Sequence, residues 1–230
     1  MEMSPAEWTA ILLSLRVAAV ATLVATPLGI ALAWLLARHD FWGKSALDAA
    51  IHLPLVLPPV VTGYLLLLSF GRHGLVGGFL ADHLDIVFAF RWTGAALACG
   101  VMSFPLLVRP IRLSIEAVDQ RLEQASATLG AAPWQVFATV TLPLALPGIL
   151  AGMVLGFAKA IGEFGATITF VSNIPGETQT ISSAIYSLIQ TPDGDTAALR
   201  LVVISIVIAT AALIGSEWFA RRATQRLHGN

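Results

Sequence analysis

Residues 17–37 read VAAVATLVATPLGIALAWLLA and contain no charged side chain, with Arg16 and Arg38 on either side. A helix needs about 20 apolar residues to cross the hydrocarbon core of a bilayer. This stretch therefore predicts a membrane-spanning helix, and it sets the class of protein in which the remaining residues are interpreted.

The composition of the whole chain agrees with a membrane protein. Of the 230 residues, 57% are hydrophobic and 12% are charged, whereas soluble domains are about 45–50% apolar and about 25% charged. So few charges would not cover the surface of a soluble domain of this length. The apolar runs are continuous, which argues against an outer-membrane barrel, where apolar and polar residues alternate. We therefore expect an all-α integral membrane protein.

The charge balance and the cysteine count narrow the class further. There are 13 basic and 14 acidic residues with no basic run, which argues against a nucleic-acid partner. Cys99 is the single cysteine of the chain, and it excludes a secreted module built on disulfides.

The apolar runs predict about five transmembrane helices in one membrane domain over residues 1–230. The expected spans are 11–37, 48–70, 92–112, 144–171 and 198–219. Glu2 and Glu7 make the N-terminus acidic where a signal peptide would be basic, so we expect the first apolar run to stay as the first helix.

The basic residues predict the orientation, because cytoplasmic loops carry an excess of Lys and Arg. Five spans place most of them on one side: Arg38, Lys44, Arg109, Arg112, Arg121, Arg221, Arg222 and Arg226. We therefore expect a multi-pass membrane protein with its N-terminus outside and its C-terminus in the cytoplasm. The loop at 119–143 is also expected on the cytoplasmic side.

The 119–143 loop predicts two short helices joined by a turn. The first is expected at about 119–129, with Gly130 where a helix-ending glycine belongs. Pro133 suits the first turn of the second helix, which is expected to reach about Thr139. Pro143 then opens the next span. A chain with little else in the cytoplasm presents this element to a partner.

The loop resembles the EAA loop of ABC importer permeases. The family pattern is Glu-Ala-Ala, three residues, Gly, nine residues, Ile, one residue, Leu-Pro. Here Gln124 stands at the position of the family's acid, with Glu123 adjacent, and Ser126 replaces the second Ala. The resemblance implies that this loop couples to a cytoplasmic ATPase subunit. The residues that would carry this role are Glu123, Gln124, Ala125, Gly130, Pro133, Leu142 and Pro143.

Three further segments, 52–64, 162–167 and 172–178, resemble the molybdate permease subfamily. The resemblance implies a type I ABC importer permease domain of the bacterial inner membrane that works with a cytoplasmic ABC ATPase dimer and a periplasmic oxyanion-binding protein. We also expect a second copy of the chain, because five helices are few for a complete pathway and closed two-fold dimers are common. ATP would be used by the ATPase, and this chain would bind no cofactor. Molybdate is the expected oxyanion, and sulfate, thiosulfate and tungstate permeases share the architecture.

Two groups of residues in the fourth span have alternative interpretations. Gly148, Gly152 and Gly156 share one helix face, which predicts close packing within the subunit or near the pathway or dimer interface. Lys159 and Glu163 are also four apart. They either pair with each other or line the translocation path, where Lys159 would offset the charge of an anion.

The second span contains Pro54, Pro58 and Pro59, followed by Thr62. Prolines at this depth predict a bend that either serves packing or shapes a gate. The chain has no Walker loop and no Cys/His metal spacing, so we expect neither catalytic nor metal-binding residues. A membrane-embedded enzyme or scaffold is the alternative class, and it would call for clustered acids or histidines at the interface, which the sequence lacks.

Overall fold

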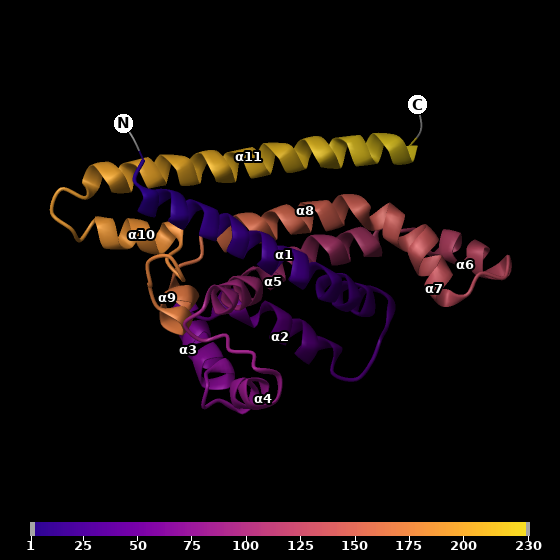
Figure 1. Cartoon of the computed structure of the whole chain (residues 1–230). Helices are drawn as coiled ribbons and strands as arrows, with labels where there is room; N and C mark the ends of the chain where they lie inside the picture. The colour runs from indigo at the N-terminus through magenta and orange to yellow at the C-terminus, as the bar shows by residue number, and fades with distance from the viewer. Residues whose placement is uncertain (1–2, 229–230) are drawn as a thin grey trace.

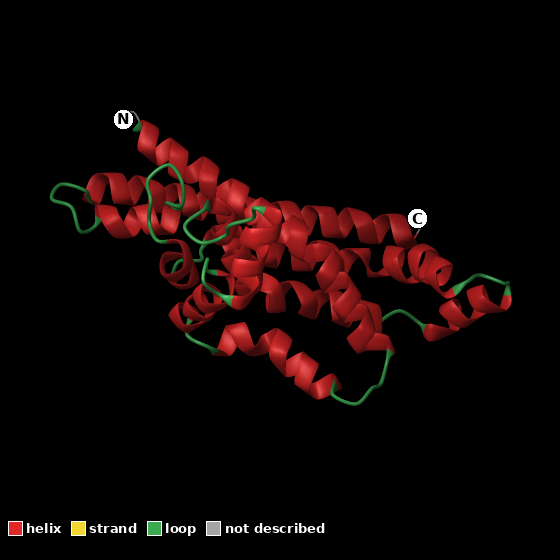
Figure 2. Cartoon of the chain, turned by 60° about the horizontal axis from the view of Figure 1, so that its bottom comes forward, coloured by secondary structure: helices red, strands yellow, loops and turns green. Residues whose placement is uncertain are grey.

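The computed structural model describes residues 3–228, and for 216–228 the backbone alone. All its regular secondary structure is helical, as Figure 2 shows, which confirms the all-α prediction for these residues. The elements are α1 (Pro5–Arg38), α2 (Lys44–Val56), α3 (Pro59–Phe70), α4 (Leu75–Leu84), α5 (Trp92–Glu116), α6 (Gln120–Thr128), α7 (Pro133–Val136), the π-helix η1 (Phe137–Thr141), α8 (Leu142–Ile161), α9 (Gly165–Val171), α10 (Ile181–Leu188) and α11 (Asp195–His228).

Four helical segments are long and apolar enough to cross a membrane: Pro5–Arg38, Trp92–Glu116, Pro133–Ile161 and Asp195–Gly215. The pair α2 and α3 passes the same test together but is bent by 116°. The described residues therefore hold up to five spans, depending on whether this bent pair is one of them.

The stretch expected as one span at 48–70 is two helices because of Pro58 and Pro59. Pro54, also expected to break the span, lies within α2. Leu57 and Pro58 both have extended backbones, with ψ of 144° and 134°. The residue before a proline avoids the α region, and proline has no N–H to continue the helical ladder. Leu57 precedes Pro58, and Pro58 precedes Pro59, so neither residue continues the helix.

The stretch expected at 144–171 is also interrupted, between α8 and α9. Glu163 lies in the break and is 1% exposed. Its Oε1 accepts a hydrogen bond from the backbone N–H of Ala166 at 3.0 Å. A helix start leaves its first N–H groups without partners, so this carboxylate stabilises a new helix start where the sequence predicted continuity.

The first helix begins at Pro5, earlier than the expected 11. Ser4 and Glu7 form a capping box: the Glu7 N–H donates to the Ser4 hydroxyl at 3.2 Å, and the Ser4 N–H donates to the Glu7 carboxylate at 2.6 Å. Glu7 also accepts a hydrogen bond from Arg200 of α11 at 3.0 Å. These contacts bury Glu7 within the first turns of α1. A span predicted from apolar residues alone begins after this acid, which is why the expected start was later.

The core lies where α5 packs between α1 and α8. Leu107, Ile111 and Ile115 of α5 are at most 1% exposed. A Cβ added to Gly152 would lie 2.5 Å from the Leu107 carbonyl oxygen, and one added to Gly148 would lie 2.7 Å from that of Pro110. Glycine is therefore required for α8 to approach α5 this closely.

The two ends of the bundle differ. Figure 1 shows α6 and α7 projecting at one end, where α11 also finishes, while α1 begins at the opposite end near α10. The helices α2, α3 and α4 lie to one side of the long helices.

Candidate functional site

The loop between α5 and α8 forms the expected helix-turn-helix. Asp119 caps α6 by accepting a hydrogen bond from the Arg121 N–H at 2.9 Å. Gly130 makes the turn with φ of +92°, a conformation that favours glycine. Pro133 is the first residue of α7, and the Gln135 side chain accepts from the Ala132 N–H at 2.8 Å.

The second arm of this loop is continuous with α8, although the sequence predicted that it would stop near Thr139. It passes from α7 through η1 into α8 with helical backbone angles throughout. The Leu142 N–H bonds to the Phe137 carbonyl five residues back. The next residue, Pro143, has no N–H to donate a further hydrogen bond five residues back, so the π turn ends there.

The loop presents apolar side chains on its outer surface. Leu129 is 90% exposed, Trp134 is 70% exposed and Leu122 is 51% exposed. Three exposed apolar side chains in one short loop are available for contact with a partner. Four of the expected coupling residues, Gln124, Ala125, Gly130 and Pro133, are exposed on the same loop, and Leu142 and Pro143 are half-buried. Sequence reasoning missed the three large apolar residues, although the seven-residue spacing of Leu122 and Leu129 puts them on one helix face.

Glu123 faces inward and is bonded within the chain. Its Oε1 accepts hydrogen bonds from Arg38 Nη2 at 3.1 Å and from Thr141 Oγ1 at 2.6 Å. The side chain of Arg38 is 10% exposed and that of Glu123 is 17% exposed. The structure thus separates Glu123 from the exposed coupling residues with which the sequence grouped it.

Lys159 and Glu163 form an ion pair, with 2.5 Å between Nζ and Oε2. Lys159 is 29% exposed, whereas the Glu163 carboxylate is enclosed and also bonds to the start of α9. Of the two interpretations, mutual pairing is the one that this geometry displays. The second oxygen of Glu163 extends the pair to the helix break.

The bend at Pro58 and Pro59 packs against that helix break. A Cβ added to Gly63 of α3 would lie 2.5 Å from the Ala166 carbonyl oxygen, and one added to Gly165 would lie 2.7 Å from the Pro59 Cβ. Thr62 is 6% exposed, and its hydroxyl has no hydrogen-bond partner among the described residues. In secondary transporters, substrate sites are often formed by interrupted membrane helices.

The glycines of α8 contact α5 of the same chain. Added Cβ atoms at Gly148, Gly152 and Gly156 would meet Ser114, Leu107 and Leu107 respectively. In this structure the three glycines therefore allow close packing of α8 against α5 within the subunit.

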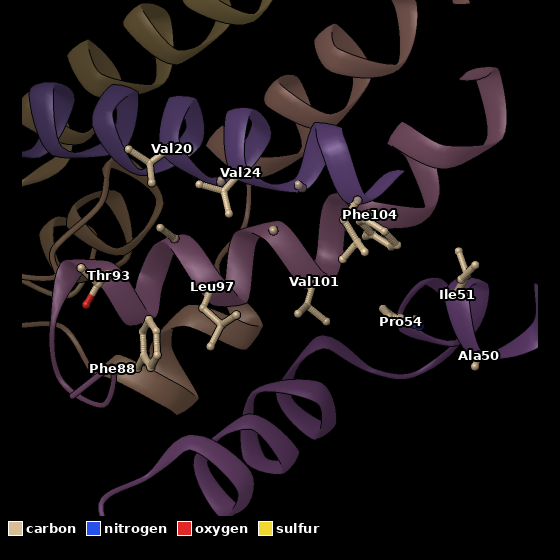
Figure 3. A pocket seen from close by; sticks show the side chains of 15 residues that line it. Val20, Val24, Ala50, Ile51, Pro54, Phe88, Thr93, Leu97, Val101 and Phe104 are labelled. Atoms are coloured by element: carbon tan, nitrogen blue, oxygen red, sulfur yellow. The ribbon is translucent and has the colours of Figure 1, made fainter. Parts of the chain in front are cut away.

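An apolar groove of about 580 Å³ lies between α1, α2 and α5. Figure 3 shows Val20 and Val24 extending from α1, Leu97 and Val101 from α5, and Pro54 from α2. Thr93 is the single polar side chain among the 15 lining residues. An apolar lining offers few groups that could replace the hydration shell of a charged solute.

The described residues contain no group of three or more His, Cys, Asp or Glu placed to hold a metal ion. The basic residues at 221, 222 and 226, which contributed to the expected orientation, have side chains outside the described part of the chain.

The fold matches that of a chain in a solved ABC transporter. A chain of a bacterial alginate ABC transporter, crystallised in complex with an alginate pentasaccharide-bound periplasmic protein, matches with a TM-score of 0.76 at 20% identity. The match covers 96% of this chain and 81% of the other. At this identity the likeness shows that the two chains share a fold.

The sequence identifies the family. The chain belongs to the binding-protein-dependent transport system inner membrane components, whose pattern matches residues 25–225. It is 61% identical over 220 residues to the molybdenum transport system permease protein ModB of Escherichia coli K12, covering 96% of both chains. It is 56% identical over 221 residues to the ModB protein of Haemophilus influenzae, again covering 96% of both.

Proposed function

We propose that this chain is the membrane subunit of an ATP-driven importer that moves molybdate across the inner membrane. The 61% identity to a molybdenum transport permease over 96% of both chains carries this proposal. Sulfate, thiosulfate or tungstate remain the competing substrates within the same class.

The partners follow from the class and from the shape of the chain. A five-span subunit is small for a complete pathway, and closed two-fold dimers are common, so a second copy of the chain completes the path. A cytoplasmic ABC ATPase dimer binds the exposed face of the 119–143 loop and hydrolyses ATP. A periplasmic oxyanion-binding protein delivers the substrate, and this chain binds no cofactor.

The pathway is proposed to run beside the contact between α3 and α9. Thr62 is buried there without a hydrogen-bond partner, and Lys159 is 29% exposed next to the break at Glu163. A partly exposed ammonium paired with a carboxylate gives weak guidance to an anion, and weak binding allows release.

Uptake into proteoliposomes tests the substrate. The chain would be co-expressed with its ATPase and reconstituted, and uptake of molybdate, tungstate, sulfate and thiosulfate would be compared in the presence of the binding protein and ATP. ATP-dependent molybdate uptake is expected, and unlabelled sulfate should compete weakly. Preferential sulfate uptake would change the substrate within the class. Absence of any ATPase from the purified complex would favour a membrane-embedded enzyme or scaffold.

A further inference from the structure

Three side chains join the end of α1 to the 119–143 loop, called the coupling loop below. Arg38, the last residue of α1, donates from Nε and Nη2 to the Oε1 of Glu123 at 3.3 and 3.1 Å. Thr141, the last residue of η1, donates its hydroxyl to the same oxygen at 2.6 Å. A charge-assisted contact shielded from water is stronger than an ion pair on the surface.

The contact also includes the residues that follow α5. Arg38 Nη2 donates to the backbone carbonyl of Val118 at 3.1 Å, and Val118 lies between α5 and α6. One arginine and one carboxylate therefore hold together the end of α1, the exit from α5, the helix α6 and the start of the long helix that continues as α8. Displacement of α6 must either move the end of α1 or break these hydrogen bonds.

The surroundings leave space for such a rearrangement. A cleft of about 400 Å³ lies beside the contact, lined by residues that include Trp34, Arg38, Glu123, Phe137 and Thr141. The rings of Trp34 and Phe137 also join α1 to η1, with 5.6 Å between centroids. A π turn such as η1 often marks a functional position within a helix.

We propose that Glu123 is a positioning residue that makes the end of α1 follow the coupling loop, acting through Arg38 and Thr141 within the chain and not through contact with the ATPase. The inference deepens the proposed function and rests on it. It assigns to the outer surface of the loop the task of binding the ATPase, and to the inner surface the task of passing the motion to α1.

A double-mutant cycle in the reconstituted transporter tests this role. The variants are Glu123→Gln, Arg38→Gln and their combination, with Glu116→Gln as the matched control, because Glu116 pairs with Arg112 at an exposed position on α5. Each single variant should lower molybdate uptake per ATP hydrolysed by about threefold to tenfold. The double variant should be no worse than either single one, since both remove the same contact. ATPase retention should be unchanged, and the control should behave as wild type.

Hydrogen exchange gives a readout that transport activity does not determine. Glu123→Gln should raise exchange together in residues 34–38 and 120–128 of the assembled complex. Thr141→Val removes one hydrogen bond with little change of shape and should shift both readouts in the same direction by less, so it serves if Glu123→Gln does not accumulate.

Two results would overturn the role of Glu123. One is wild-type uptake per ATP in Glu123→Gln. The other is loss of the ATPase subunit in Glu123→Gln with losses additive to those of Arg38→Gln, because that pattern means direct contact with the partner. Failure of the wild-type complex to transport molybdate would instead contradict the proposed function.

Discussion

At the scale of single residues, the ion pair between Lys159 and Glu163 shows how this chain accommodates charge in an apolar segment. Both oxygens of the Glu163 carboxylate are bonded, one to Lys159 and one to the Ala166 N–H. Removing one partner of a buried pair leaves an uncompensated charge, which costs more than the pair itself contributes. A variant of Lys159 alone therefore tests folding as well as transport.

Lys159→Met should lower the free energy of unfolding by about 3 kcal/mol, at the low end for a broken buried pair because Lys159 is partly exposed. Lys159→Met combined with Glu163→Gln should recover most of that loss, because the glutamine is neutral and still accepts from Ala166. Thermal unfolding of both variants in detergent measures the difference. Equal destabilisation of the two would contradict the explanation by an unpaired carboxylate. Normal uptake by the stable double variant would remove Lys159 from the proposed pathway.

Gly130 adopts a left-handed backbone conformation with φ of +92°, and no atom lies within 4 Å of an added Cβ. A side chain there meets no neighbour, so the cost of substitution is strain in the backbone of the turn, about 1–2 kcal/mol for a residue other than glycine. Gly130→Val should misplace α6 relative to α7 and reduce co-purification of the ATPase. Gly130→Asn should retain more binding, because asparagine tolerates positive φ better. If both variants co-purified with as much ATPase as the wild type, the turn geometry would not be needed for binding.

At the scale of elements, the interruption of two apolar helices defines the interior of the chain. The break between α2 and α3 and the break between α8 and α9 face each other through Gly63 and Gly165. The backbone of Ala166 occupies the space that a side chain at Gly63 would need. The angle of 116° between α2 and α3 is thus accompanied by packing against α9.

Gly63→Ala should separate α3 from α9, because its Cβ would lie 2.5 Å from the Ala166 carbonyl oxygen and 2.9 Å from the Ala166 Cα. Backbone atoms cannot move aside as a flexible side chain can, so a loss of about 1–3 kcal/mol is expected. Gly215→Ala is the matched control, since it is a helical glycine with nothing within 4 Å of the added Cβ. It should be neutral or stabilising by up to about 1 kcal/mol. Thermal unfolding of the two variants measures this difference. Equal unfolding midpoints would contradict the close approach of α3 to α9 at Gly63.

Individual positions show how far the sequence predicts these elements. Pro58 and Pro59 predict an interruption, but its angle depends on α9, which is about 100 residues away in the chain. Glu163 reads as a charge to be neutralised, and its bond to the Ala166 N–H follows from a helix break that no periodicity signals. In the loop, Gly130 and Pro133 predict the turn correctly. The inward direction of Glu123 depends on Arg38 and Thr141, which the sequence does not place beside it.

At the scale of the whole molecule, the two ends of the bundle carry different chemistry. The end with the 119–143 loop also holds the end of α1, through Arg38 and Glu123. Arg112 pairs there with Asp48 of α2 at 3.0 Å. At the opposite end, Glu7 of α1 pairs with Arg200 of α11. The excess of Arg and Lys in the segments beside the loop supports a cytoplasmic location for that end.

Single cysteines at the two ends test this orientation in intact cells. Cys99, the native cysteine, is 1% exposed and can be replaced by Ser to give a background free of thiols. Leu129→Cys then places a thiol on the loop, at a position that is 90% exposed. Glu177→Cys places one in the exposed segment between α9 and α10.

A membrane-impermeant maleimide should label the Glu177→Cys variant in spheroplasts and leave the Leu129→Cys variant unlabelled. In inverted vesicles the pattern should reverse, because the loop then faces the reagent. Labelling of Leu129→Cys in intact spheroplasts would place the loop outside, away from any cytoplasmic ATPase, and would contradict both the orientation and the coupling role.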